Sequence, residues 1–187
     1  MIGYAFCGSF CTLERSFAAL EQLLLQGYEV QPIMSEVVYT TDTRFGTAAA
    51  WRDRAEQLCG KRIIHTIVQA EPLGPAQPLE ALVISPCTGN TLAKMACGIT
   101  DTAVCMAAKA HLRCDRPLII ALASNDALSG NLKNLAQMRM RRGVWMLPLE
   151  QDDPVNKPHS LVACFECLPQ VLKMALCGEK GREKLFL

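Results

Sequence analysis

The stretch Ala81–Asp101, ALVISPCTGNTLAKMACGITD, decides the fold of this chain. It begins with a short continuous apolar run at 81–85, which is typical of a parallel strand buried on both faces. Residues 86–91 follow as a predicted turn of small hydroxyl and amide side chains, and 92–98 as a helix that ends on glycine. A strand that stops abruptly and feeds a helix leaves the first N–H groups of that helix pointing into a crevice.

Two interpretations of this helix start are open. Free N–H groups at a helix N-terminus favour a phosphate or another anion, so the stretch predicts half of a ligand site. The alternative is an ordinary strand–helix turn in which Thr88 or Asn90 caps the helix. The other strand ends of the sheet therefore matter, because a ligand site needs contributions from them as well.

The length and composition predict a single domain, 1–187, with a full-sized core. The chain has 187 residues, of which 50% are hydrophobic and 20% charged, a composition that excludes disorder. Its net charge of +1, from 19 basic and 18 acidic residues without a long basic run, predicts no binding to nucleic acid. No apolar stretch reaches the roughly 20 residues of a membrane span, and the N-terminus has the pattern of a first strand rather than of a signal peptide. We therefore expect a cytoplasmic protein without membrane contact and with a mobile charged tail at 178–187.

Ten cysteines are a high number for such a chain. Because the chain is too large and too apolar to need a disulfide framework, we expect most thiols to be reduced and to pack as small hydrophobic side chains. Cys164 and Cys167 have CxxC spacing, and Cys7 and Cys11 flank the first predicted turn. A zinc site needs about four ligands and the chain has no second CxxC, so we expect no metal site.

Strands and helices alternate along the rest of the chain. Apolar runs predict strands at 2–6, 29–34, 63–68, 117–123 and 144–147, in addition to the strand at 81–85. Helical periodicity and capping residues predict helices at 13–26, 47–59, 102–112, 132–141 and 161–176, the last capped by Ser160, with polar loops at 39–45 and 150–158. This alternation predicts an α/β protein with a mostly parallel sheet covered by helices on both faces.

Polar residues follow four of the predicted strands: Gly8 and Ser9, then Ser35, then 85–91, then 124–126. In an open parallel sheet, ligands bind outside the carboxyl ends of the strands, at the point where the strand order reverses. We therefore expect these strand ends to converge on one crevice. The spacing around Gly8 is not GxGxxG, so the first turn lacks the dinucleotide-binding fingerprint.

The residues at these strand ends resemble those of the FMN-binding flavoprotein family, which includes phosphopantothenoylcysteine decarboxylase, the peptidyl-cysteine decarboxylases and flavin prenyltransferase. The resemblance is carried by the Gly-Ser turn after the first strand, by Ser35, and by the turn Pro86-Cys-Thr-Gly-Asn-Thr. It extends over nearly the whole chain through three longer segments, 70–101, 104–135 and 148–163. It implies a Rossmann-like, flavodoxin-like three-layer sandwich that binds FMN.

The resemblance also implies which residues bind the cofactor. Gly8, Ser9 and Ser35 are expected at the FMN phosphate and ribityl chain, and Ser124 and Asn125 at the flavin ring. The turn against the cofactor comprises Pro86, Thr88, Gly89, Asn90 and Thr91, with Lys94 beside it, and Phe10 and Ser85 complete the expected set. The chemistry is consistent, because a phosphate binds N–H groups and hydroxyls at helix starts, and a flavin ring needs an apolar slot with a few placed amides. No catalytic residue is assigned.

Within the family, the longer segments resemble one subunit of a two-subunit oxidoreductase. This implies an enzyme subunit that is catalytic only with its partner, an NADP-binding subunit, and that oxidises a small dicarboxylate to a pyridine diacid during sporulation. A homo-oligomer is also implied, because family members build their flavin pockets between subunits. Six cations are candidates for binding the substrate carboxylates, although each also fits a solvated surface charge: Arg44, Lys109, Arg113, Lys133, Arg139 and Lys157.

Two other functions remain open. One is a non-catalytic partner subunit that keeps the fold but has lost the flavin. The other is a flavin-dependent cysteine decarboxylase, from whose pattern this chain departs. The segment that carries a His in those enzymes is EPLGP at 71–75 here, and Ser124-Asn125-Asp126 replaces their Met-Asn motif. His65 lies several residues earlier, and we expect it to be a strand or core residue.

Overall fold

The computed structural model of the chain describes residues 1–178, so the tail predicted at 178–187 lies, apart from Gly178, outside the described residues. The strands are β1 Ile2–Phe6, β2 Val30–Met34, β3 Ala81–Thr88, β4 Leu118–Ser124, β5 Val144–Met146, β6 Leu149–Glu150 and β7 Leu161–Ala163. The α-helices are α1 Leu13–Leu25, α2 Glu36–Thr40, α3 Ala48–Cys59, α4 Ile67–Ala70, α5 Gly89–Ala96, α6 Ala103–Leu112, α7 Leu132–Met140 and α8 Leu168–Cys177.

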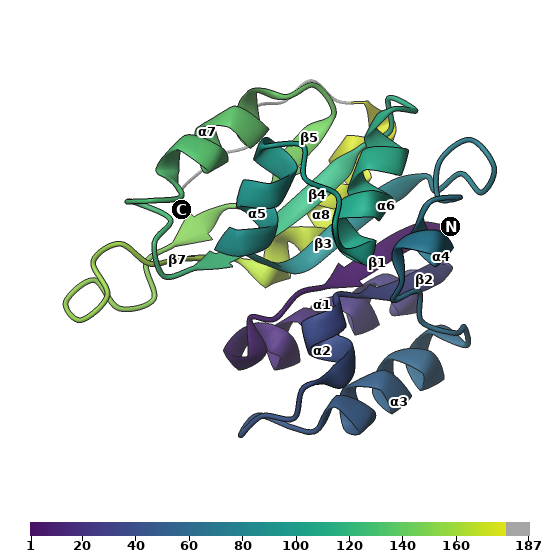
Figure 1. The fold of residues 1–187 in the computed structure, drawn as a ribbon, viewed down its shortest axis with the longest axis horizontal. Coiled ribbons are helices and arrows are strands. Elements are labelled where there is room, and N and C mark those ends of the chain that lie inside the picture. Colours follow the sequence, from purple (N-terminus) through teal and green to yellow (C-terminus); the bar gives the residue numbers. More distant parts are fainter. Residues whose placement is uncertain (179–187) are drawn as a thin grey trace.

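The described strands form one sheet in the order β2–β1–β3–β4–β7–β6 (Figure 1). The pairs β1–β2, β1–β3 and β3–β4 are parallel. The outer edge of β4 is divided: its first half pairs in parallel with β5, and its end pairs antiparallel with β7, where Ala123 lies opposite Val162. The sheet is therefore mostly parallel, and its strand order reverses between β1 and β3.

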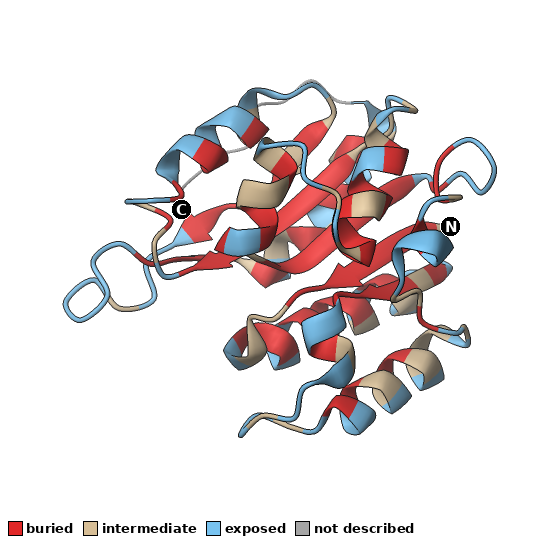
Figure 2. Ribbon diagram, viewed as in Figure 1, coloured by how far each residue is buried: buried red, intermediate tan, exposed pale blue. Residues whose placement is uncertain are grey.

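Helices cover both faces of this sheet. In Figure 1, α5 and α6 lie in front of β3 and β4, and α7 lies beside α5 and β5. Helices α1 and α8 lie behind the sheet and contact each other. Figure 2 shows that the strands are buried along nearly their whole length. This arrangement confirms the predicted three-layer α/β sandwich, and it explains why β3 and β4 consist of continuous apolar runs rather than alternating ones.

The core beneath α1 contains a chain of aromatic side chains. Phe17 of α1 stacks on Phe6 of β1 with ring centroids 4.6 Å apart, and on Trp51 of α3 at 5.4 Å. The Tyr4 ring lies 5.0 Å from that of Phe6. All four rings are buried, so they tie α1 and α3 to the first strand through apolar contact rather than through hydrogen bonds.

A buried polar network lies beside these rings. The Tyr4 hydroxyl donates to the carbonyl of Ser16 at 2.7 Å, and the Ser16 hydroxyl donates to the carbonyl of Ser85 at 2.6 Å. Burial raises the pKa of Tyr4, so its hydroxyl stays protonated and remains a donor. Ser85, an expected cofactor residue, is thus fully buried and joins β3 to α1.

The strand predicted at 63–68 is wrong. Ile64 makes one isolated parallel bridge to Ile33, and α4 begins immediately afterwards. The cause is a capping box: the Thr66 side chain accepts from the Gln69 N–H at 3.2 Å, and the Gln69 side chain accepts from the Thr66 N–H. His65 is accordingly neither a strand nor a core residue, because its half-buried ring stacks on Tyr39 with centroids 3.8 Å apart.

The helix predicted to begin at Ser160 also starts in the wrong place. Residues 161–163 form β7 instead, because their backbone pairs with the free edge at the end of β4 and their apolar side chains are buried there. Helix α8 begins at Leu168, with a proline in its first turn, where the missing N–H costs nothing. The polar loops predicted at 39–45 and 150–158 begin too early, because residues 39–40 still belong to α2 and Glu150 to β6. The turn predicted at 86–91 is divided between β3 and α5.

No helix among residues 1–178 is long and apolar enough to cross a membrane. Within the same residues, no group of three or more His, Cys, Asp or Glu side chains is arranged to hold a metal ion. The ten cysteines are free thiols, with the Sγ atoms of Cys164 and Cys167 3.1 Å apart.

Candidate functional site

A groove of about 830 Å³ lies at the carboxyl ends of the parallel strands. Its walls are the β1–α1 turn, the start of α5, the residues that follow β4, and the loop 151–160. It lies at the point where the strand order reverses between β1 and β3, as expected for a ligand site. Eight of the expected cofactor residues line it: Gly8, Ser9, Phe10, Thr88, Gly89, Asn90, Ser124 and Asn125.

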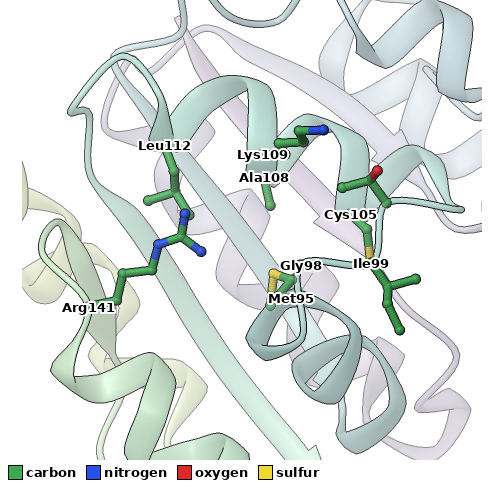
Figure 3. A pocket seen from close by; sticks show the side chains of 9 residues that line it. Met95, Gly98, Ile99, Cys105, Ala108, Lys109, Leu112 and Arg141 are labelled. Atoms are coloured by element: carbon green, nitrogen blue, oxygen red, sulfur yellow. The ribbon is translucent and has the colours of Figure 1, made fainter.

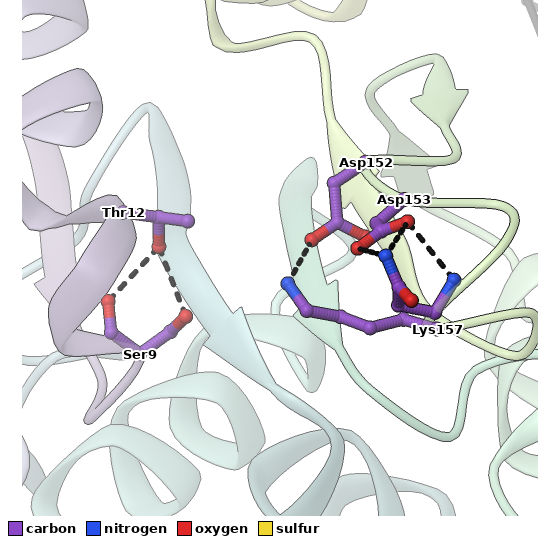
Figure 4. A network of polar contacts seen from close by, with 6 residues as sticks. Ser9, Thr12, Asp152, Asp153 and Lys157 are labelled. Atoms are coloured by element: carbon purple, nitrogen blue, oxygen red, sulfur yellow. Dashed lines mark hydrogen bonds and ion pairs between the residues drawn. The ribbon is translucent and has the colours of Figure 1, made fainter.

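On the β1 side, a short turn presents the Ser9 hydroxyl to the groove (Figure 4). The Thr12 hydroxyl lies 3.0 Å from Ser9 Oγ and 2.9 Å from the Ser9 carbonyl oxygen, and donates to both. Ser9 therefore acts as an acceptor for Thr12, and its own hydroxyl hydrogen is available to a further acceptor. A Cβ at the neighbouring Gly8 would lie 2.8 Å from Val37 Cγ1, so a side chain there would have to displace Val37.

Ser35 holds a buried hydroxyl that has no partner among the described residues. It directly follows β2, and its backbone N–H donates to the Phe6 carbonyl at 3.0 Å, which fixes it beside the end of β1. An unpartnered buried hydroxyl costs about 1–3 kcal/mol, so its position needs an explanation. A phosphate oxygen at this strand end would supply the missing acceptor.

The junction between β3 and α5 confirms Thr88 as the helix N-cap. The Thr88 hydroxyl accepts from the Thr91 N–H at 3.2 Å, and the helix begins at Gly89. Thr91 itself points inward, where its hydroxyl donates to the sulfur of Cys7 at 3.4 Å. Burial raises the pKa of Cys7 to about 12, so this thiol is a buried structural group and not a nucleophile.

Five of the expected cofactor residues do not line the groove. Four of them are buried: Ser35 directly after β2, Ser85 and Pro86 within β3, and Thr91 in α5. Lys94 is further along α5 and pairs with Asp101 at 2.8 Å. The hydrogen bond from Lys94 lowers the pKa of Asp101. Lys94 therefore lies about one helical turn beyond the groove, where its ion pair with Asp101 holds it away from the expected site.

After β4, a compact polar network closes the groove. Asp126 accepts from the Ser124 hydroxyl at 2.6 Å and from the Asn131 side-chain amide at 2.9 Å through both carboxylate oxygens. Asn134 donates to the Asn131 side-chain oxygen at 2.8 Å, which leaves the Asn131 amide nitrogen facing Asp126. The hydrogen bonds from Ser124 and Asn131 lower the pKa of Asp126, so this carboxylate is ionised at neutral pH.

The hydrogen bonds to Asp126 predict a contribution to stability that is lost in acid. The pKa of Asp126 in the folded protein lies below its usual value of 3.8, so the contribution is complete above that value and disappears as the pH falls through the folded-state pKa. We expect the loss of unfolding free energy between about pH 6 and about pH 3, measured with urea, to be smaller in Asp126→Asn than in the wild type. An equal loss in both proteins would show that the network does not stabilise the ionised form.

Two cations lie at the groove, and both are paired with acids. Lys157 of the loop pairs with Asp152 at 2.8 Å, on the side of the groove opposite Ser9 (Figure 4). Arg15 of α1 pairs with Glu166 at 3.2 Å. Of the six cations considered from the sequence, Lys157 is the one that lines this groove. Arg15 was missed, although it lies one helical turn after the polar residues that follow β1, and this spacing could have identified it.

A second, smaller cavity of about 200 Å³ lies between α5, α6 and the end of α7 (Figure 3). Its walls are mostly apolar, with Lys109 and Arg141 at the rim. None of the expected cofactor residues lines it. The groove at the strand ends is therefore the candidate site.

A three-layer α/β fold with this groove at its point of strand reversal is the architecture of the flavoproteins. Residues 1–170 match the family model described as Flavoprotein, and the chain belongs to this family. It is similar to the B subunit of dipicolinate synthase from Bacillus subtilis (strain 168), with 44% identity over 179 residues that cover 96% of this chain and 90% of that protein. The similarity expected from the sequence is thereby confirmed.

Solved structures agree with this assignment. The crystal structure of the dipicolinate synthase B subunit from Bacillus halodurans C superposes with a TM-score of 0.89 at 36% identity, covering 100% of this chain and 95% of that one. Burkholderia xenovorans DmrB in complex with FMN, described as a cubic protein cage for redox transfer, has a TM-score of 0.68 at 20% identity and covers 95% of each chain. At this identity, the similarity to DmrB shows that the two proteins share a fold.

Proposed function

We propose that the chain is the FMN-binding B subunit of a dipicolinate synthase, which acts with the A subunit of that enzyme to oxidise dihydrodipicolinate to dipicolinate. The proposal is supported by the 44% identity to a dipicolinate synthase B subunit over nearly the whole length of both proteins. A protein named as one subunit of an enzyme acts in an assembly, so the proposal includes a partner, which carries NADP. It also places the protein in the cytoplasm of a sporulating cell.

The observation that carries the flavin part of the proposal is the unpartnered Ser35 hydroxyl at the end of β2. Together with the hydroxyl of Ser9 and the backbone at Gly8, it offers donors for one phosphate group where two strands end side by side. The exposed amides of Asn90 and Asn125 lie on the other wall, where they would orient the flavin ring. When bound, FMN supplies an acceptor for the two electrons that the oxidation removes.

The residues of this chain also suit a dicarboxylate substrate. Arg15 and Lys157 lie at the groove, and each is held by an exposed ion pair that a substrate carboxylate can replace at little cost. Their proposed role is to bind and orient the substrate, and no proton transfer is assigned to them. The proposal includes a homo-oligomer, in line with DmrB, a protein of the same fold that is described as a cubic protein cage.

The test is a visible absorption spectrum of the purified protein, recorded as isolated and again after incubation with FMN and desalting. We expect flavin absorption to remain with the protein at about one FMN per chain. A colourless protein that also releases added FMN would overturn the flavin part and favour a flavin-free, non-catalytic partner, with the redox chemistry on the A subunit. An assay that combines this chain, the A subunit and dihydrodipicolinate, and measures dipicolinate, then tests the reaction itself.

The Ser35→Ala variant separates binding from stability. The Ser35 hydroxyl makes no hydrogen bond to any residue within 1–178, so its removal should leave the unfolding free energy unchanged or raise it by up to about 1 kcal/mol. The same change should weaken FMN binding by roughly tenfold, because it removes one hydrogen bond to a charged phosphate. Flavin fluorescence titration and urea unfolding measure the two effects. A Ser35→Ala protein that binds FMN as tightly as the wild type would exclude Ser35 from the phosphate site.

A further inference from the structure

The start of α5 forms one wall of the groove, and a carboxylate of the protein lies beside it. An ideal Cβ built on Gly89, the first residue of α5, would lie 3.1 Å from Asp126 Oδ1 and 2.4 Å from Ser124 Oγ. The Asp126 carboxylate is thus packed against the N-terminal end of an eight-residue helix. A phosphate at this helix start was one of the two interpretations left open by the sequence, and the structure places a negative charge beside this end of the helix.

The position of this charge is firmly determined. The Asp126 carboxylate accepts from Ser124 and from Asn131, and the backbone N–H of Asn131 donates to the Asp126 carbonyl at 3.0 Å. Asn131 is also the N-cap of α7, so the positive ends of α5 and α7 both lie beside the carboxylate. The carboxylate therefore places a negative charge close to two helix starts, where a ligand anion would otherwise be favoured.

The groove is consequently different at its two ends. At the β1–β2 end, the Ser9–Ser35 end, the Ser9 hydroxyl lines the groove and the buried Ser35 hydroxyl lies outside its lining. No acid is among the lining residues of the β1–α1 turn. At the β4–α5 end lies Asp126, whose side-chain hydrogen-bond partners, Ser124 and Asn131, are neutral. The other groove acid, Asp152, differs in being paired with Lys157.

We propose that Asp126 is a specificity-determining residue that excludes a second phosphate from the start of α5. A ligand with one phosphate fits with that group at the Ser9–Ser35 end and hydrogen-bond donors of its ring toward Asp126. A ligand with a diphosphate would bring its second phosphate against the carboxylate, and like charges at this distance repel strongly in a partly buried site. The orientation of a one-phosphate ligand rests on the proposed function, whereas the exclusion of anions from α5 does not.

The experiment measures binding of inorganic pyrophosphate, the smallest probe with two phosphate groups, by calorimetry on the wild type and on Asp126→Asn. We expect Asp126→Asn to bind pyrophosphate at least about tenfold more tightly than the wild type, because the variant keeps the side-chain volume and loses the charge. Asp153→Asn is the matched control, since it removes the same charge from a residue that does not line the groove, and it should leave pyrophosphate binding unchanged.

Because an amide at 126 faces the amide nitrogen of Asn131, Asp126→Ala serves as a second variant, and thermal unfolding shows that each protein is folded. If both folded variants bind pyrophosphate no more tightly than the wild type, the proposal is overturned. If the wild type binds no FMN but Asp126→Asn gains pyrophosphate binding, the flavin function fails while the exclusion by Asp126 stands. A gain of the same size in Asp153→Asn would show a general charge effect and also overturn the proposal.

Discussion

Gly89→Ala is expected to lower the unfolding free energy by about 2–4 kcal/mol, although alanine is the better helix former. The added Cβ would lie 2.4 Å from Ser124 Oγ and 2.6 Å from Asn131 Nδ2. Neither atom can move without losing its hydrogen bond to Asp126, and each bond lost to a charged group costs about 1.5–3 kcal/mol. Helix propensity alone predicts the opposite sign, a gain of up to about 1 kcal/mol, so urea unfolding distinguishes the two effects.

A double-mutant cycle with Ser124→Ala provides the control for this prediction. Ser124→Ala removes the hydroxyl nearest to the new Cβ, so the double variant should be less destabilised than the sum of the two single variants. Gly89→Ala should also lose most FMN binding, because the network that forms one wall of the groove is displaced. A Gly89→Ala protein as stable as the wild type would show that this wall adjusts freely, and would remove the steric reason for glycine at this position.

Phe17→Ala is expected to be the most destabilising of the single changes considered, by about 3–5 kcal/mol. The Phe17 ring is fully buried and lies between Phe6 at 4.6 Å and Trp51 at 5.4 Å, with the Arg54 guanidinium over its face at 4.5 Å. Truncation leaves a cavity between α1, α3 and β1 and removes two aromatic contacts of about 0.5–1.5 kcal/mol each. Denaturant unfolding at equilibrium measures the loss.

The matched control for Phe17→Ala is Leu25→Ala on the same helix. Leu25 is a large apolar residue but 79% exposed, so its truncation should change the unfolding free energy by less than about 0.5 kcal/mol. Losses of similar size in the two variants would mean that helix propensity in α1, rather than the aromatic contacts, sets the stability. A small loss in Phe17→Ala would mean that the neighbouring rings collapse into the space.

The parts of the fold that depend on local pattern could be predicted from the sequence. The buried apolar runs of β1 and β4 and the spacing of Leu13, Phe17 and Leu20 on α1 identify sheet and core directly, because burial on both faces leaves an unbroken apolar run. The predictions were wrong where a local hydrogen-bond motif competes with strand formation, or where a strand forms only because of a partner strand distant in the sequence. Thr66 and Gln69 form a capping box that stops a β-branched run, and residues 161–163 become a strand because β4 offers an edge far away in the sequence.

The candidate site likewise contains residues that could be predicted from the sequence and residues that could not. Residues at the ends of parallel strands or shortly after them, such as Ser9, Thr88 and Ser124, could be predicted to meet, because the carboxyl ends of those strands lie at one edge of the sheet. The contribution of Asp152 could not, since it depends on how a distant loop packs over the groove. The role of Asp126 at the start of α5 also required coordinates, because sequence gives the residue types of a turn but not the direction of a carboxylate.

The divided edge of β4 has a consequence for the growing chain on the ribosome. When β1 to β5 have emerged, the end of β4 at Ala123 and Ser124 still lacks its outer neighbour, which arrives only with residues 161–163. Until then this segment presents unpaired backbone groups next to apolar side chains, the pattern that nucleates aggregation between nascent chains. The same late segment supplies Ser160 and Val162 to the groove, so sheet closure and completion of the site occur in a single, late step of synthesis.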